Sequence, residues 1–261
     1  MNEEFIQFIK DMNDVSEIRV NRLDNIFESE IDEFYNSSFY TTESVSNGIV
    51  IAIKKFFINL IQEIERWVNS INIAVERKQR EVGYRKNLLI IEKKLKNAID
   101  NGYDGKVTIT DHDSILKDYK AKYKLLASYG KKFAKMKYNS TSEIDKDIEE
   151  FNRHLDEYEK EMDFIEKKTI TVDAKEALKM VQKELSGNSS YLDTINDLKS
   201  DIKELEEESI LLEKRSSELG SGVIPKHLNL LRITASSISK FSRKWIGRFI
   251  GKFVFTFANI I

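Results

Sequence analysis

Residues 142–165 read SEIDKDIEEFNRHLDEYEKEMDFI, and their apolar positions decide the fold class of the chain. Spacings of four and three residues alternate without error over three heptads, at Ile144, Ile148, Phe151, Leu155, Tyr158, Met162 and Ile165. This alternation places the apolar side chains on one side of an α-helix, where a second helix can cover them. With Ser142 as N-cap, the stretch predicts a helix that carries a coiled-coil seam.

A second seam follows further along the chain. Its positions keep the same spacing over four heptads, with two serines in the C-terminal half: Tyr191, Ile195, Leu198, Ile202, Leu205, Ser209, Leu212, Ser216 and Leu219. Between the seams, the sequence predicts a short helix over 173–185, with bends at 169–172 and 186–190. We expect these bends to fold the two seams onto each other as an antiparallel coiled-coil hairpin.

The composition of the 261 residues is also typical of helices. Charged residues make up 33% and hydrophobic residues 41%, with ten glycines, one proline and no cysteine. Elongated helices expose more surface per residue than a compact domain, and so they tolerate this many lysines and glutamates. We therefore predict an all-α fold, an elongated helical bundle or coiled-coil hairpin with a separate C-terminal amphipathic helix.

The first half of the chain predicts helices with one interruption. Residues 1–47 indicate two short helices and a polar loop, and an amphipathic helix follows from about Ser46. Helical periodicity continues to about Ile99, and 103–109 is the one segment typical of a strand. Thr110 and Asp113 then resemble a capping box that begins the next helix. With a boundary at Pro225, the predicted segments are 1–47, 48–138, 139–220 and 221–261.

The charges of the chain are unevenly distributed. The last 43 residues carry seven basic side chains and no acidic one, whereas residues 1–218 carry 35 basic and 44 acidic side chains. The basic end also has aromatic residues at four-residue intervals, and Gly247 with Gly251 has the spacing of a close-packing pair. Three roles fit this tail: packing on its own bundle, docking on a partner protein, or binding an anionic membrane. The candidate contact residues are Lys240, Phe241, Arg243, Lys244, Trp245, Arg248, Phe249, Lys252, Phe253 and Phe257.

A second basic region surrounds Tyr119 and Tyr123. Its lysines could contact phosphates while the tyrosines stack on bases, so nucleic acid is a candidate partner of Lys120, Lys122, Lys124, Lys131 and Lys132. The tyrosines also have helical spacing, which favours a place in the core and leaves the lysines on a solvated face. Binding that does not weaken as salt rises would exclude the nucleic-acid hypothesis.

The sequence offers no motif for catalysis, a cofactor or a metal. His112, His154 and His227 are far apart, and Asp111 to Asp113 is more typical of a helix N-cap cluster than of a ligand set. Neither a phosphate-binding glycine loop nor a nucleophile elbow occurs. Paired acids such as Glu149 and Glu150 lie on charged helix faces. We therefore predict a protein that is not an enzyme. No uncharged stretch approaches the length of a transmembrane helix.

Residues 46–70 read SNGIVIAIKKFFINLIQEIERWVNS, and the AIKKFF core with Leu60, Ile61, Ile64 and Trp67 resembles helical proteins encoded among the structural genes of low-G+C bacteriophages. The resemblance implies a virion protein made in the host cytoplasm and packaged inside the head or near the portal, to be ejected with DNA. Capsid, portal or tail proteins, or further copies of the chain, would be its partners. It implies no catalytic residues.

Three functions therefore remain open on the sequence. The first is a non-enzymatic structural or internal virion protein that acts through helical protein–protein contacts. The second is a membrane-active protein whose apolar faces at 49–75 and 226–261 stay buried until lipid exposes them. The third is a coiled-coil scaffold unrelated to virions.

Overall fold

The computed structural model describes residues 2–36, 42–80, 82–165, 167–186, 200–204, 206–207 and 223–253. Nearly all of this described chain is helical, and the exception is one two-stranded antiparallel sheet. The prediction of an all-α fold is therefore confirmed.

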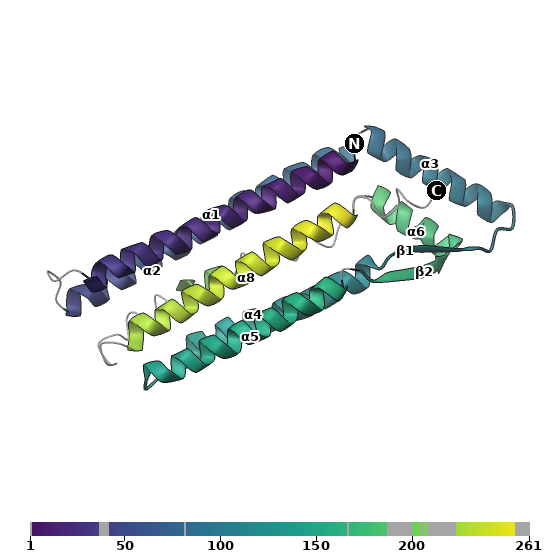
Figure 1. Ribbon diagram of the computed structural model, residues 1–261. Helices are drawn as coiled ribbons and strands as arrows, with labels where there is room; N and C mark the ends of the chain where they lie inside the picture. The colour runs from purple at the N-terminus through teal and green to yellow at the C-terminus, as the bar shows by residue number, and fades with distance from the viewer. Residues whose placement is uncertain are drawn as a thin grey trace.

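Five long helices form the body of the molecule: α1 (Asn2–Asn36), α2 (Thr42–Arg80), α4 (His112–Lys135), α5 (Thr141–Ile165) and α8 (Val223–Phe253). Figure 1 shows them as three layers, with the α1–α2 pair on one side, the α4–α5 pair on the other and α8 between them. Helix α8 packs against all four of the others, whereas the two pairs meet chiefly through α8. We call this body the bundle.

Helix α8 lies at the centre because it can bury nearly its whole circumference. Between residues 227 and 249 its large apolar residues alternate with serine, threonine, alanine and glycine, and only a few positions reach solvent. The sequence predicted a separate C-terminal helix, and the structure corrects this. The aromatic stripe needs apolar neighbours, and the faces of α1, α2, α4 and α5 supply them.

Helix α1 is continuous where the sequence predicted two short helices. Its buried side chains Ile9, Ser16, Val20 and Phe27 recur at intervals of seven and four residues, which keeps them on one side of a single helix. The polar residues after Tyr35 were predicted as a loop to Ser46, but α2 already begins at Thr42. The apolar repeat therefore determines the extent of these helices, even where the local sequence is polar.

The remaining elements form a small unit at one end of the rod, which we call the head (Figure 1). It comprises α3 (Val82–Asp100), β1 (Lys106–Thr110), β2 (Thr169–Asp173) and α6 (Ala174–Leu185). The strands pair antiparallel from Lys106 opposite Asp173 to Thr110 opposite Thr169. Strand β1 agrees with the prediction, whereas 169–172 was predicted as a bend and is a strand. Its alternation buries Val172 and directs Thr171 outward, as a half-buried strand requires.

The first predicted seam forms α5, and its partners are α4 and α8. Ile144, Phe151 and Met162 are buried in the bundle, so the repeat indicated the correct face. Most of the second seam lies outside the described residues, and with it the predicted pairing of the two seams. Within the described part, Ile202 joins the bundle core and Tyr123 of α4 donates a hydrogen bond to Asp201.

Candidate functional site: α8 and its acidic neighbours

Five of the cations of α8 are paired with carboxylates that come from α1 and α5. Toward α5, Lys226 contacts Asp145 at 2.6 Å, Lys244 contacts Glu159 at 2.6 Å and Arg248 contacts Asp163 at 3.0 Å. These three acids recur along α5, so they follow α8 for most of its length. Two sides of the bundle therefore neutralise these cations. Toward α1, Arg232 lies 3.9 Å from Glu28, and the shorter contacts converge on one other residue.

Asp24 of α1 is that residue. Its two carboxylate oxygens accept hydrogen bonds from Arg232 at 2.6 Å, from Lys240 at 2.7 Å and from the hydroxyl of Ser236 at 2.7 Å. The Arg232 guanidinium also lies 4.4 Å from the ring centroid of Phe27. Charge-assisted bonds to a half-buried carboxylate are stronger than surface ion pairs, so Asp24 anchors the N-terminal half of α8.

Arg243 differs from the other cations of α8. It is 1% exposed, and none of its three guanidinium nitrogens has a hydrogen-bond partner among the described residues. Burial lowers the pKa of Arg243 to about 10, and the negative charges of Glu63 and Glu17 oppose this shift. The guanidinium lies 5.8 Å from the ring centroid of Trp67, which offers a weak cation–π contact. A buried cation without a hydrogen bond is destabilising.

Further polar side-chain atoms of the bundle are buried without a partner in the described chain. They include the hydroxyls of Ser239 and Ser242 and the indole nitrogen of Trp245 on α8, with Ser16 on α1 and Asn72 on α2. A buried donor or acceptor that leaves water without replacing its hydrogen bond costs roughly 1–3 kcal/mol. The middle of α8 is thus buried at a cost.

Aromatic packing opposes that cost. Tyr119 of α4 stacks on Phe241 with centroids 5.9 Å apart and meets Phe249 edge-on at 5.7 Å. Trp245 lies between the two phenylalanines, 6.3 Å from each. Each of these large side chains is buried, and burial of a large apolar side chain contributes on the order of 1.5–3 kcal/mol. Aromatic burial therefore holds the strained middle of α8 in place.

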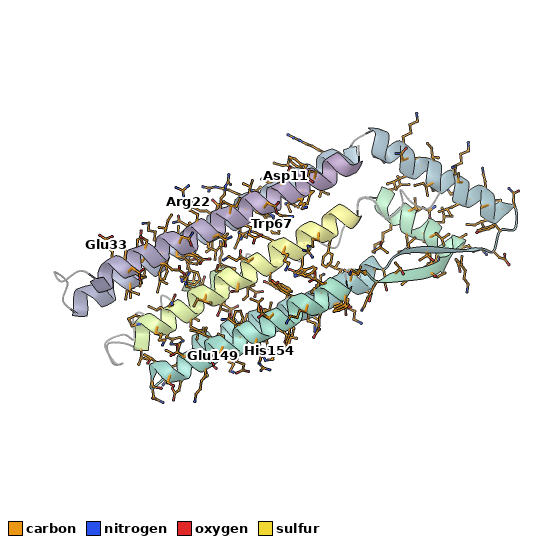
Figure 2. All side chains as sticks on the ribbon, in the orientation of Figure 1. Asp11, Arg22, Glu33, Trp67, Glu149 and His154 are labelled. Carbon is orange, nitrogen blue, oxygen red and sulfur yellow. The ribbon has the colours of Figure 1, made fainter. Side chains whose placement is uncertain are left out.

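Helices α1 and α8 are in close contact at Gly247. A Cβ on Gly247 would lie 1.5 Å from Nδ2 and 2.4 Å from Cγ of Asn13, so a larger residue here must displace the end of the Asn13 side chain. Oδ1 of Asn13 accepts a hydrogen bond of 2.8 Å from the indole of Trp67. Figure 2 shows Trp67 between the α1–α2 pair and α8. The close packing predicted for Gly247 is therefore present, while the surroundings of Gly251 lie outside the described residues.

His227 joins the start of α8 to the end of α4, and sequence reasoning gave it no role. Its Nε2 lies 2.7 Å from the carbonyl oxygen of Phe133, and its ring meets Tyr138 edge-on at 4.6 Å. Burial lowers the pKa of His227, whereas the carbonyl of Phe133 and the charge of Asp147 oppose the shift. Its one sequence signal was an aromatic-sized polar residue two positions after Pro225, near the start of α8.

The predicted tail contacts thus have three different environments. Phe241, Arg243, Trp245 and Phe249 are buried, so a partner or a membrane cannot reach them in this conformation. Lys240, Lys244 and Arg248 lie at the edges of α8 in ion pairs. The side chains of Lys252 and Phe253, and all of Phe257, lie outside the described residues. Their predicted partner contacts stay a prediction.

The lysines of α4 surround a tyrosine pair that belongs to the core. Tyr119 and Tyr123 are buried, as the alternative interpretation predicted. Lys122 pairs with Glu161 of α5, and Lys131 contacts Asp201 and Glu204. Lys132 lies beside the rings of Tyr129 and Phe133, Lys124 is exposed and Lys120 is half-buried. Nucleic-acid contact by these lysines stays a prediction, and it would have to compete with the ion pairs of Lys122 and Lys131.

A groove of about 250 Å³ lies between α1 and α2. Phe8, Met12 and Val15 of α1 form its apolar wall, and Trp67 contributes from α2. Glu63 lines the groove and pairs with both Arg19 and Arg66. Asp11 is the second carboxylate of the groove, which therefore combines apolar surface with charged side chains, a composition that suits a protein partner.

The described residues contain no group of three His, Asp or Glu side chains that could hold a metal ion. Asp111 instead caps α4, because its side chain accepts the backbone N–H of Ser114 at 3.1 Å, and this agrees with the predicted capping role. Among the described helices, none is long and apolar enough to cross a membrane.

Comparison with known proteins finds no relative. No family model matches the chain, and neither a curated protein nor a solved structure is similar to it.

Proposed function

We propose that this chain is a non-enzymatic structural or internal protein of a bacteriophage particle, which binds its neighbours through the outer surfaces of its helices. The resemblance of residues 46–70 to helical structural proteins of bacteriophages supports this proposal. These residues lie within α2. Its partners would be capsid, portal or tail proteins, or further copies of the chain.

One observation carries the proposal: α2 has apolar side chains on both of its sides. Phe56, Leu60 and Ile64 are buried, yet Ile51 is 65%, Ile58 49% and Ile73 52% exposed. The three exposed isoleucines lie within about 60° of one another around the helix, opposite the buried side. These isoleucines give the outer side of α2 apolar surface on which a second protein could pack.

The groove between α1 and α2 supports a second contact on the same hairpin. Phe8 and Val15, each 48% exposed, line it together with the half-buried Met12. Since the groove and the three exposed isoleucines lie on different sides of α2, one molecule could bind two neighbours at once. Two binding surfaces suit a protein that is present in many copies within an assembly.

The proposal is tested by mass spectrometry of gradient-purified particles from the phage that encodes the chain. We expect the protein in wild-type particles, and we expect Ile51→Ser combined with Ile58→Ser to reduce its incorporation at least fivefold. Leu125→Ser is the matched control, because Leu125 is 46% exposed on α4, away from the three exposed isoleucines. Absence of the wild-type protein from particles would exclude the proposal. Normal incorporation of the double variant would exclude the exposed isoleucines as the contact.

A further inference from the structure

We propose that α8 is a stored lipid-binding helix: it leaves the bundle at an anionic membrane surface and lies there, with lipid phosphates in place of the carboxylates of α1 and α5. This inference goes beyond the proposed function and does not depend on it. It rests on the charges of α8, on the polar atoms that α8 buries and on the way the α1–α2 and α4–α5 pairs meet.

The first step is the charge complementarity between α8 and its surroundings. Val223–Phe253 contains no acidic residue, so every carboxylate that neutralises it comes from another element. Asp24 on α1 and Asp145, Glu159 and Asp163 on α5 hold five of its cations. Like the carboxylates of α1 and α5, an anionic membrane surface presents negative charge along the length of the helix. Each basic residue near such a surface contributes favourable binding free energy.

The second step is the cost of the buried state. Inside the bundle, the guanidinium of Arg243, the hydroxyls of Ser239 and Ser242 and the indole nitrogen of Trp245 have no hydrogen-bond partner among the described residues. At a membrane surface, arginine and tryptophan side chains bury their apolar parts while their polar ends reach head groups and water. Transfer to lipid therefore satisfies groups that the bundle leaves unsatisfied.

The third step is the architecture. The α1–α2 and α4–α5 pairs each pack within themselves and meet chiefly through α8. Withdrawal of α8 therefore breaks its contacts with all four helices, while the contacts within the α1–α2 pair and within the α4–α5 pair stay in place. The head packs by itself through α3, α6 and the sheet, so it is not disturbed.

Lipid fits α8 better than nucleic acid does. A polyanion such as duplex DNA would neutralise the cations but leave Phe241, Trp245 and Phe249 exposed to water, whereas a bilayer interface buries them as well. Since none of the described helices can cross a membrane, α8 would lie in the interface and not span it.

The test uses a disulfide that fastens α8 to α1. Asn13 Cγ would lie 2.4 Å from a Cβ on Gly247, so the two Cβ atoms fall within the roughly 3.5–4.5 Å that a disulfide needs. The chain has no cysteine of its own, and Trp67→Phe leaves Trp245 as the sole tryptophan. The full-length variant Asn13→Cys, Gly247→Cys, Trp67→Phe is compared oxidised and reduced. Thr108→Cys, Thr171→Cys, Trp67→Phe is the matched control, because these threonines face each other across the head sheet, with hydroxyls 3.2 Å apart.

Two measurements are made with vesicles of phosphatidylglycerol and phosphatidylcholine: co-flotation, and quenching of Trp245 by brominated acyl chains. We expect the reduced protein to bind and be quenched, oxidation of the 13–247 pair to lower partitioning at least about tenfold, and oxidation of the 108–171 pair to change neither. Pure phosphatidylcholine vesicles should bind far less. Equal binding by both redox forms of the 13–247 variant, absence of quenching, or capture by duplex DNA in preference to vesicles would overturn the proposal.

Discussion

The head and the bundle are built from different kinds of core. Among the described residues of the head, the buried side chains are all aliphatic: Leu88, Ile91, Leu95, Ile109, Val172, Ala174, Ala177 and Val181. Its described polar residues make their contacts at the surface, as between Gln182 and Glu92. In the bundle, α8 carries seven buried polar or charged residues into the middle of an aromatic core: His227, Arg232, Thr234, Ser236, Ser239, Ser242 and Arg243.

This difference shows that a larger core does not by itself satisfy the polar groups that it buries. The head is small, yet its described core leaves no polar group unsatisfied. The bundle buries far more surface but keeps a cationic helix inside it, which aromatic burial and ion pairs must offset. We therefore expect substitutions in α8 to change stability in both directions and to leave the head unaffected.

The largest effect is expected from Trp245→Ala. Removal of a fully buried tryptophan costs about 3–5 kcal/mol, so the bundle should lose that much free energy of unfolding in a urea titration followed by circular dichroism. Because the head has its own core, amide hydrogen exchange in α3 and α6 should be little changed. Equal loss of protection in the head and the bundle would show one cooperative unit and remove the comparison.

Arg243→Met should stabilise the protein, in contrast to Trp245→Ala. Methionine fills a similar volume without a charge, so we expect the free energy of unfolding to rise by on the order of 1–4 kcal/mol. Arg248→Met is the control, since Arg248 lies at the surface and should change stability by less than about 0.5 kcal/mol. A loss of stability in Arg243→Met would mean that the cation is better accommodated than its geometry indicates.

His227 should make the bundle sensitive to acid. Burial lowers its pKa in the folded state, so as the pH falls below about 6.5 the unfolded chain takes up a proton that the folded chain resists. Stability is then present above that pH and falls below it, with a slope of at most about 1.4 kcal/mol per pH unit from this residue. In His227→Gln, whose amide can still donate to Phe133, urea titrations between pH 7.5 and 5 should show a smaller slope. An unchanged slope would assign the acid sensitivity to other groups.

Asp111→Ala tests the junction between the two regions and should have the smallest effect. Asp111 follows β1 and caps α4, and loss of such a cap costs about 1 kcal/mol. Thermal unfolding should shift by a few degrees. Asp111→Asn, which can still cap, should restore most of the difference, and failure of that rescue would mean that the charge acts in another way.

The sequence predicts what local repeats control. The apolar spacing of 142–165, the N-cap cluster at 111–113 and the glycine at 247 each depend on neighbours within a turn or on a close helix contact, and these predictions agree with the structure. The capping box expected from Thr110 and Asp113 is wrong, because Thr110 ends β1 and Asp111 is the N-cap of α4. Tyr119 and Tyr123 were also assignable to the core by their spacing.

The predictions that differ from the structure depend on residues far apart in sequence. Strand β2 was predicted as a bend because its five residues need β1, more than fifty residues earlier, as a partner. Helix α8 was predicted to be separate because the glycines and the proline at 220–225 indicated a domain boundary, with packing on its own bundle left open as an alternative. The carboxylate partners of its cations lie on α1 and α5, and no local pattern reveals such pairs.

The central place of α8 also bears on the order in which the molecule is assembled. Among the described helices it is the last to leave the ribosome, yet the other four bundle helices need it as their common neighbour. Until α8 has been synthesised, the apolar sides of the α1–α2 and α4–α5 pairs remain uncovered. Such exposed apolar surface favours aggregation or binding by a chaperone. Production of the protein should therefore be limited less by its final stability than by how quickly its C-terminal helix arrives.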